Sequence, residues 1–454
     1  MMTYQEAQDY LNSFVNYEEI TNYSYENDFR IERIQALLQL LGNPQDTLRV
    51  IHVAGTKGKG STCIFIAHIL QQAGFTTGLY TSPHLYSVRE RIRILDPADN
   101  AAQGVEHNGC FFGMISEADV CACIEKLKPA VERCAKESPW GALTFFEVYT
   151  TLAFLYFKEK QVDFAVLETG LGGRLDATNT AQALVSVITP VSYEHTQYLG
   201  ATLEEIAREK AGIIKHRNQA VVVAPQQESV AQEIRLRCER IGARCTFVNN
   251  DITCKEVESN SEHQFFNCAS PQKTYNKLKI KLLGKHQLIN AACSIGAIER
   301  LRQHSIDIPE ESIKRGLDNA CWPGRFEIVK RSPTIVLDGA QNAASAEALR
   351  ETLIRQFGNK KVILVLGVSS DKDIKGIAKA LASSAKTIIL TKANHPRAMS
   401  LEIMGKYFNP SLAHSTETVK DAMNKAQQLV GNDDVIAVTG SLFVVAEARE
   451  LCLS

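Results

Sequence analysis

The chain has 454 residues, and its 50 Lys and Arg against 51 Asp and Glu give a formal net charge of −1. Without a basic excess it is a poor candidate for broad nucleic-acid binding, and its length exceeds what one core usually supports, so we expect two or three domains. Its 45% hydrophobic and 22% charged residues exclude disordered and fibrous classes.

No run approaches the ~18 apolar residues of a membrane span. The first residues, MMTYQEAQDYLNSF, lack the basic and apolar regions of a signal peptide. The 12 cysteines are irregularly spaced and form no CxxC pair. We therefore expect a cytoplasmic protein with reduced, buried thiols, without membrane attachment and without a zinc or disulfide scaffold.

Short runs rich in Val and Ile alternate along the chain with helical patterns. Such runs predict parallel strands buried on both faces, and hence an α/β fold with wound parallel sheets. Helices are predicted at 61–73 and 345–357, each followed by glycine. The predicted strands cover residues 49–54, 162–168, 184–189, 220–224, 335–338, 361–367, 387–391 and 435–439.

Two polar, poorly periodic segments, about 96–141 and 249–277, interrupt this alternation. We expect them to be surface insertions of the first domain. A new series of strands begins after about residue 320, so the predicted domains are 1–319 and 320–454.

The sequence HVAGTKGKGST at 52–62 joins a predicted strand to a predicted helix. Its glycines favour a turn whose N–H groups, with the helix amino terminus, bind an anion. Lys59 is suited to the outer phosphates and Ser61 to Mg²⁺. The pattern has one more glycine than GxxxxGK[ST]; the alternative is a simple tight turn, but a nucleotide site is favoured.

Glu168 ends an apolar strand beside this loop, where a carboxylate is well placed to take Mg²⁺. A glycine-rich polar turn follows at 169–179, and His195 ends the next strand-like run on the same expected sheet edge. Lys210 lies in a helix, and the pattern alone predicts that its stem lies along the helix with its head in water.

Polar turns also follow the strands of the second half, at 338–342, 371–373, 391–397 and 439–441. Each turn alone is weak evidence. Together they predict a ligand-binding edge, because ligands of wound α/β sheets bind at the carboxyl ends of strands.

The ordered motifs of this chain resemble those of folylpolyglutamate synthases, including bacterial forms that are also dihydrofolate synthases, within the Mur ligase superfamily. The resemblance covers about residues 29–442. It implies an N-terminal P-loop-type ATPase domain that also binds folate, and a smaller, Rossmann-like C-terminal domain that contacts glutamate and ATP. The motifs are HVAGTKGKGST, TSPHL with RERI, LETGLGGRLDATN, EHTQYLG, REKAGI, PGRFE and DGAQN.

The resemblance implies roles for individual residues. Lys59, Lys210 and His195 would act in catalysis, with Lys210 as a carbamate that helps to hold a second Mg²⁺. The implied metal ligands are Ser61, Glu168, His195 and Lys210. The implied ATP-binding residues are Gly55, Thr56, Lys57, Gly58, Lys59, Gly60, Ser61, Asn290, Arg325, Asp338 and Gln341. The implied folate-site residues are Ser82, Pro83, His84, Thr144, Phe146 and Asp176.

The implied reaction transfers the γ-phosphoryl group of ATP to a carboxylate of a folate or of dihydropteroate, and the amine of L-glutamate then attacks the acyl phosphate. No enzyme nucleophile is needed, and no Gly-x-Ser-x-Gly turn is present. The family is mostly monomeric. This chain departs from it at Lys57 (usually Asn in bacterial members), Glu194 (Asp), Gln341 (His) and Ala343 (Pro).

Two alternatives stay open at this point. One is another Mur-type ligase that acts on cell-wall precursors. Two observations argue against it: the TSPHL and LTFFE strings, and the lack of a uridine-binding domain before residue ~45. The other is a nucleotide-dependent switch without ligase activity.

Overall fold

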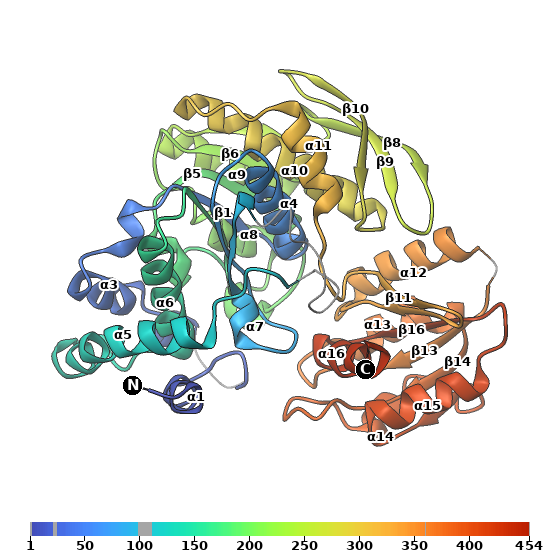
Figure 1. Ribbon diagram of the computed structural model, residues 1–454. Helices are drawn as coiled ribbons and strands as arrows, with labels where there is room; N and C mark the ends of the chain where they lie inside the picture. Colours follow the sequence, from blue (N-terminus) through green and yellow to red (C-terminus); the bar gives the residue numbers. More distant parts are fainter. Residues whose placement is uncertain (1, 21–24, 99–110, 359, 454) are drawn as a thin grey trace. The chain divides into compact units, whose positions relative to one another are not determined.

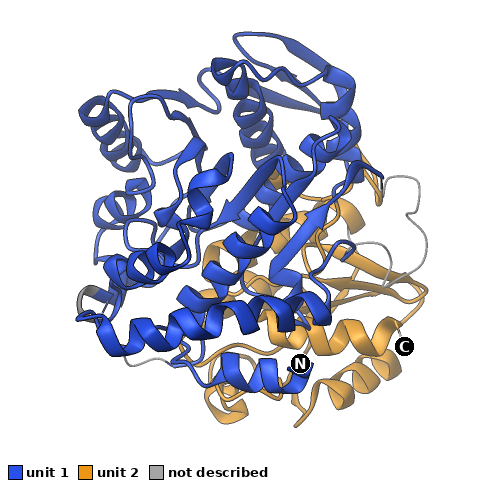
Figure 2. Ribbon diagram, turned by 60° about the vertical axis from the view of Figure 1, so that its left-hand side comes forward, with its two compact units in different colours: residues 1–257, 265–280, 288–320 blue, residues 258–264, 281–287, 321–454 orange. Residues whose placement is uncertain are grey.

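The computed structural model describes residues 2–20, 25–98, 111–358 and 360–453. Two compact units divide the chain, and Figure 2 colours them separately. Unit 1 comprises Met1–Val257, Phe265–Ile280 and Leu288–Ala320; unit 2 comprises Glu258–Gln264, Lys281–Gln287 and Cys321–Ser454. The functions assigned from sequence to domains 1–319 and 320–454 stay a prediction.

Unit 1 is built on a seven-stranded sheet in the order β3-β2-β4-β1-β5-β6-β7 (Figure 1). Every neighbouring pair is parallel except β2 and β3. The central strands are buried along their whole length, as the apolar runs predicted. The strands are β1 (Val50–Ala54), β2 (Thr77–Tyr80), β3 (Ile92–Leu95), β4 (Phe164–Glu168), β5 (Ala183–Ile188), β6 (Ala220–Val223) and β7 (Arg244–Phe247).

Helices cover this sheet and form two of the buried clusters of the protein. One cluster includes Leu37, Leu127 and Leu152, from α3, α5 and α6, and the other includes Ile206 and Ile234, from α8 and α9. The α-helices of unit 1 are α1 (Tyr4–Asn12), α2 (Tyr25–Asp28), α3 (Ile31–Leu40), α4 (Lys59–Gln72), α5 (Glu117–Glu137), α6 (Phe145–Glu159), α7 (Thr196–Leu199), α8 (Leu203–Ala211), α9 (Glu228–Ile241), α10 (Lys285–Arg300) and α11 (Glu310–Asn319), of which α10 begins within a segment of unit 2.

Unit 2 contains a six-stranded sheet in the order β11-β12-β16-β13-β14-β15, parallel except for β11 and β12. Its strands are β11 (Glu327–Arg331), β12 (Thr334–Leu337), β13 (Val362–Leu366), β14 (Ala385–Leu390), β15 (Ala413–Ser415) and β16 (Val435–Thr439). Its helices are α12 (Ala343–Phe357), α13 (Ile374–Leu381), α14 (Leu401–Gly405), α15 (Val419–Leu429) and α16 (Leu442–Leu453).

The fold class predicted from the sequence is confirmed, and each predicted strand is present with its ends shifted by at most two residues. Both predicted helices are also present, as α4 and α12. The short apolar runs located the strands because parallel strands are covered by helices on both faces.

Much of both polar segments forms regular secondary structure. Residues 99–110 of the first lie outside the described part of the chain, but residues 117–137 form α5, which lies beside α6 (Figure 1). Its buried side chains recur at helical spacing. They are Val120, Cys123, Ile124, Leu127, Val131 and Cys134.

The second polar segment folds into a three-stranded sheet in the order β10-β9-β8. Its strands are β8 (Thr253–Ser259), β9 (Gln264–Ala269) and β10 (Thr274–Ile280). Buried and partly exposed residues alternate along β9, so one face packs inward although no apolar run marks the strand.

In the described part of the chain, ten cysteines carry free thiols. Cys321 is disulfide-bonded, which departs from the expectation that the thiols are reduced. Within the described residues, no helix is long and apolar enough to cross a membrane.

The alternation in β9 predicts unequal effects for two adjacent phenylalanines. Phe266 is fully buried, so Phe266→Ala is expected to lower the free energy of unfolding by about 3 to 5 kcal/mol, through lost burial and a cavity. Phe265→Ala, on the opposite and partly exposed face, should have a much smaller effect. Urea denaturation of both variants would measure this, and equal effects would contradict the assignment of the faces.

Candidate active site

The loop after β1 leads directly into α4, whose residues from Ser61 to Gln71 are all buried. The backbone amides of Thr56 and Lys57 both donate to the carbonyl of Pro190, at 3.0 and 3.2 Å. These two N–H groups are therefore engaged in hydrogen bonds within the protein. In the anion-binding turn expected from the sequence, the groups that can bind an anion are the amides from Gly58 onward and the amino terminus of α4.

Gly55 is the residue in this loop that tolerates a side chain least. Its φ is +147°, and an added Cβ would lie 1.9 Å from Oγ1 of Thr189. Gly58 also has positive φ, and its missing Cβ leaves room for Oδ1 of Asn290, a buried residue of α10. The structure thus brings Asn290 against the predicted phosphate loop within unit 1.

Glu168 lies where the sequence predicted it, at the carboxyl end of β4. In the sheet Val53 pairs with Glu168, so the carboxylate stands beside the last residues of β1. Nζ of Lys59 lies 3.9 Å from Oε1 of Glu168, and the backbone N–H of Ser82 donates to Oε2 at 3.3 Å. One side chain thus joins the phosphate loop to the loop after β2.

Lys210, in the last turn of α8, is 5% exposed, and its Nζ donates to the carbonyl oxygen of Gly55 at 2.9 Å. The expectation from pattern alone, a head group in water, is wrong. Burial and, to a smaller extent, the positive charge of Lys59 lower the pKa of Lys210 to about 7, although Glu194 and Asp176 act in the opposite direction. An ε-amino group that is partly neutral near pH 7 thus lies beside the phosphate loop.

His195 and its neighbour Glu194 follow β5. His195 is half-buried with φ of +52°, and its carbonyl accepts the first backbone hydrogen bonds of the short helix α7. Burial lowers the pKa of Lys57, and the negative charge of Glu194 raises it. Among the described residues, no group of three or more His, Cys, Asp or Glu side chains forms a metal centre.

His84, in the loop after β2, belongs to a partly buried polar chain whose central member, Arg91, is fully covered. Nε of Arg91 donates to Nδ1 of His84 at 2.9 Å, and the other guanidinium nitrogens donate to both carboxylate oxygens of Glu18 at 2.8 and 2.6 Å. Burial and the adjacent Arg91 lower the pKa of His84 to about 3. His84 is therefore a neutral side chain held by Arg91, and Pro83 beside it is exposed.

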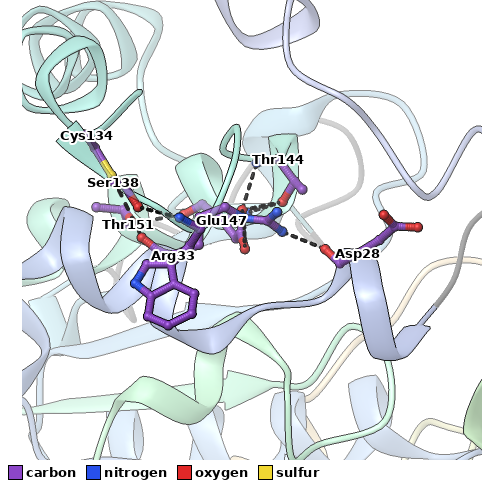
Figure 3. Close-up of polar contacts among 8 residues, drawn as sticks. Asp28, Arg33, Cys134, Ser138, Thr144, Glu147 and Thr151 are labelled. Atoms are coloured by element: carbon purple, nitrogen blue, oxygen red, sulfur yellow. Dashed lines mark hydrogen bonds and ion pairs between the residues drawn. The ribbon is translucent and has the colours of Figure 1, made fainter. Parts of the chain in front are cut away.

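Thr144 is the amino-terminal cap of α6, and its backbone N–H and hydroxyl both donate to Glu147, at 2.8 and 3.0 Å. Figure 3 shows Glu147 between Thr144 and Arg33, whose Nε lies 2.9 Å from both carboxylate oxygens. Arg33 also donates to the backbone of Asp28. This buried pair fixes the start of α6 and with it Phe146, whose ring fills the space beside Gly170.

Asp176 is 2% exposed, and its oxygens accept four hydrogen bonds from its own loop. Oδ2 accepts from the amides of Gly170 and Leu171, and Oδ1 from the amide and the hydroxyl of Thr178. Asp176 thus closes the glycine-rich turn that follows Glu168.

In unit 2, Asp338 and Gln341 follow β12, and Arg325 precedes β11. Asp338 accepts from the amides of Phe326 and Ala340, at 2.8 and 2.9 Å. Burial raises its pKa to about 6, and the nearby Arg325 opposes that rise. The amide of Gln341 donates to the Ser345 hydroxyl in the first turn of α12. The three predicted residues of unit 2 therefore gather at one edge of its sheet.

Comparisons with known proteins identify the family of the chain. The model of the Mur ligase middle domain matches residues 138–298, and that of the Mur ligase glutamate ligase domain matches residues 324–442. A dihydrofolate synthase/folylpolyglutamate synthase from Bacillus subtilis (strain 168) is 36% identical over 420 residues, which are 92% of this chain and 94% of the relative. The chain belongs to the folylpolyglutamate synthase/dihydrofolate synthase family of Mur ligases.

Solved structures of this family share the whole fold. Mycobacterium tuberculosis folylpolyglutamate synthase complexed with ADP has a TM-score of 0.88 at 30% identity, over 99% of this chain and 98% of that one. Escherichia coli FolC in complex with DHPP and ADP has a TM-score of 0.83 at 29% identity, over 99% and 97%. The family resemblance inferred from the motifs is therefore confirmed.

Several residues that build the site were not singled out from the sequence, although Arg91 lies in the RERI string and Glu147 in the LTFFE string. Arg33, Glu147, Glu18 and Arg91 pair across wide separations in the chain, and Pro190 contributes only a carbonyl. A capping pattern, T-x-x-E at 144–147, was the one local sign of Glu147.

The lowered pKa of Lys210 predicts a stability cost that depends on pH. A lysine with a folded pKa near 7 and an unfolded pKa near 10.4 destabilises the fold fully below pH 7, and the cost falls as the pH rises toward 10. Lys210→Met should therefore be more stable than wild type at pH 6.5, and this advantage should shrink by about 2 to 3 kcal/mol by pH 9.5.

Urea unfolding in metal-free and carbon dioxide-free buffer would measure that difference. Lys425→Met, on the partly exposed surface of α15, is the matched control and should show no such dependence. A constant difference between Lys210→Met and wild type would contradict the lowered pKa.

Proposed function

We propose that this chain is an ATP-dependent ligase that forms an amide bond between L-glutamate and the carboxylate of a folate. The observation that carries the proposal is the convergence of Lys59, Lys210 and Glu168 on the loop that begins at Gly55. The cation of Lys59 and a turn rich in N–H groups suit a nucleoside triphosphate, and the family assignment supplies the chemistry.

In this proposal residues 55–61 bind the phosphates of ATP, with Lys59 on the outer phosphates. Asn290 of unit 1 is also proposed to contact the nucleotide. Arg325, Asp338 and Gln341 of unit 2 are proposed as ATP-binding residues from the family motifs. The relatives whose structures contain ADP support ATP as the nucleotide. Fixed cations and amides stabilise the charge that moves during phosphoryl transfer, which needs no nucleophile from the enzyme.

The residues proposed to hold Mg²⁺ have suitable chemistry for that ion. The carboxylate of Glu168 and the hydroxyl of Ser61 are buried oxygen donors beside the loop, and His195 adds a nitrogen. Bound Mg²⁺ would neutralise phosphate charge during the transfer. Lys210 is proposed to carry a carbamate that helps to hold a second ion, since a neutral amine is the form that reacts with carbon dioxide.

The folate is proposed to bind beside Phe146 and the glycine-rich turn, at Ser82, Pro83, His84, Thr144 and Asp176. The polar side-chain atoms of Thr144 and Asp176 are hydrogen-bonded within their own loops. The role proposed for these two residues is therefore to shape the pocket. Transfer of the γ-phosphoryl group to the folate carboxylate gives an acyl phosphate, the amine of L-glutamate attacks its carbonyl carbon, and phosphate leaves.

Dihydropteroate is proposed as a second acceptor. The Bacillus subtilis relative bears both activities in its name, and the Escherichia coli structure contains DHPP. By analogy with the family to which the chain belongs, we also propose a monomer that works in the cytoplasm.

Release of ADP would test the reaction directly. With ATP and Mg²⁺, release should require L-glutamate together with tetrahydrofolate, and release with dihydropteroate would add the second activity. The matched control omits glutamate. If neither pterin stimulates release from protein that binds ATP, the folate assignment is wrong.

Gly55→Ala should abolish this activity, because its Cβ would collide with Thr189 and displace the loop that binds phosphate. We expect a loss of at least ~100-fold in kcat/KM, the equivalent of about 3 kcal/mol in transition-state stabilisation. Gly405→Ala, whose Cβ meets no atom within 4 Å, is the control and should keep full activity. Retained ATP binding by Gly55→Ala, measured by calorimetry, would contradict the role of the loop.

A further inference from the structure

A chain of three buried side chains runs from the middle of β1 to the glycine-rich turn. Nε2 of His52 lies 2.8 Å from Oγ1 of Thr178, and that hydroxyl lies 2.5 Å from Oδ1 of Asp176. His52 and Thr178 are fully buried, and Asp176 is 2% exposed. None of the roles assigned above uses His52 or Thr178.

The direction of these hydrogen bonds follows from what each atom can donate. Three backbone amides, those of Gly170, Leu171 and Thr178, donate to the carboxyl group of Asp176 and favour its ionised form, although burial acts in the opposite direction and raises its pKa. The single proton of the Thr178 hydroxyl is therefore donated to Asp176. Oγ1 of Thr178 then accepts from His52, which must carry its proton on Nε2.

Burial keeps His52 neutral, with a pKa lowered to about 3. Its Nδ1 has no hydrogen-bond partner among the described residues, which agrees with a ring protonated on Nε2 alone. One donor thus points from the central strand of the sheet toward the loop.

The far end of the chain determines the shape of the turn after Glu168. Oδ2 of Asp176 accepts from the amides of Gly170 and Leu171, both at 2.9 Å. The ring of Phe146 fills the space beside Gly170. The carboxylate therefore holds the part of the turn that lies against Phe146.

We propose that His52 and Thr178 are positioning residues that hold the Asp176 carboxylate against the turn and so shape the folate side of the site. The proposal rests on the proposed function, because it assigns the pocket beside Phe146 to the folate. β1 thus positions two loops: its end leads to the phosphate loop, and its middle fixes the turn that follows Glu168. Neither residue touches a substrate.

The central variant is Thr178→Val, which is nearly isosteric and removes the hydroxyl. Hydrogen bonds to a charged group contribute about 1.5 to 3 kcal/mol, so KM for tetrahydrofolate should rise by ~10- to 100-fold. KM for ATP should change less than twofold. Thr178→Ser restores the hydroxyl and should recover wild-type behaviour.

The matched control is Thr352→Val, in α12 of unit 2. Thr352 is also buried, and its hydroxyl donates to the carbonyl of Ala348 within its own helix. This variant tests the loss of a buried hydroxyl without the link to Asp176, and both KM values should stay unchanged. His52→Gln, which keeps an N–H donor, should be milder than His52→Leu.

Hydrogen–deuterium exchange gives a readout that does not depend on the folate assignment. Without any substrate, the amides of Gly170 and Leu171 should exchange at least ~10-fold faster in Thr178→Val than in wild type, and at the wild-type rate in Thr178→Ser. If these amides respond but tetrahydrofolate does not stimulate any variant or wild type, the positioning role stands and the proposed substrate is wrong.

Three results would overturn the inference. The first is unchanged exchange at Gly170 and Leu171 in Thr178→Val. The second is a parallel rise of KM for ATP and for tetrahydrofolate, which indicates general destabilisation. The third is a Thr178→Ser variant as impaired as Thr178→Val, because the hydroxyl would then not be the cause.

Discussion

The pairing of β1 with its two parallel neighbours is the constraint on which the site of unit 1 depends. Val53 pairs with both Glu168 and Val187, so three strands reach the same sheet edge in register. A shift of one residue would turn every side chain of β1 to the other face of the sheet. Because β1 is buried throughout, the register that places Glu168 beside the phosphate loop is also the one that packs the core.

This arrangement brings several charged side chains together in a largely buried site. Lys59 and Lys210 lie close enough that the charge of one lowers the pKa of the other, and Glu168 lies 3.9 Å from Lys59. Burial and Lys59 destabilise the charged form of Lys210, and the negative charges of Glu194 and Asp176 partly offset this effect. An anion bound at the phosphate loop would favour the charged forms of both lysines.

The sequence predicted the parallel sheets and the positions of Glu168 and the phosphate loop, because buried parallel strands are short apolar runs and the residues at their ends are local in sequence. The prediction missed α5 and β9, because their buried residues recur at regular spacing within mainly polar segments. It also could not find the partners of Lys210 or Asp176. A carbonyl such as that of Gly55, or a hydroxyl such as that of Thr178, is matched to its partner only by the folded chain.

The division of the chain into two units has a consequence for the order in which they form. Two segments of the second unit, Glu258–Gln264 and Lys281–Gln287, come earlier in the chain than Leu288–Ala320, which is the last segment of the first unit. Leu283, in the second of these early pieces, belongs to the hydrophobic cluster built mainly from residues beyond 320. During synthesis from the amino terminus, this leucine emerges long before its neighbours. The cluster that Leu283 joins is not complete until β16, which contributes Val435 and Ala437, has been made.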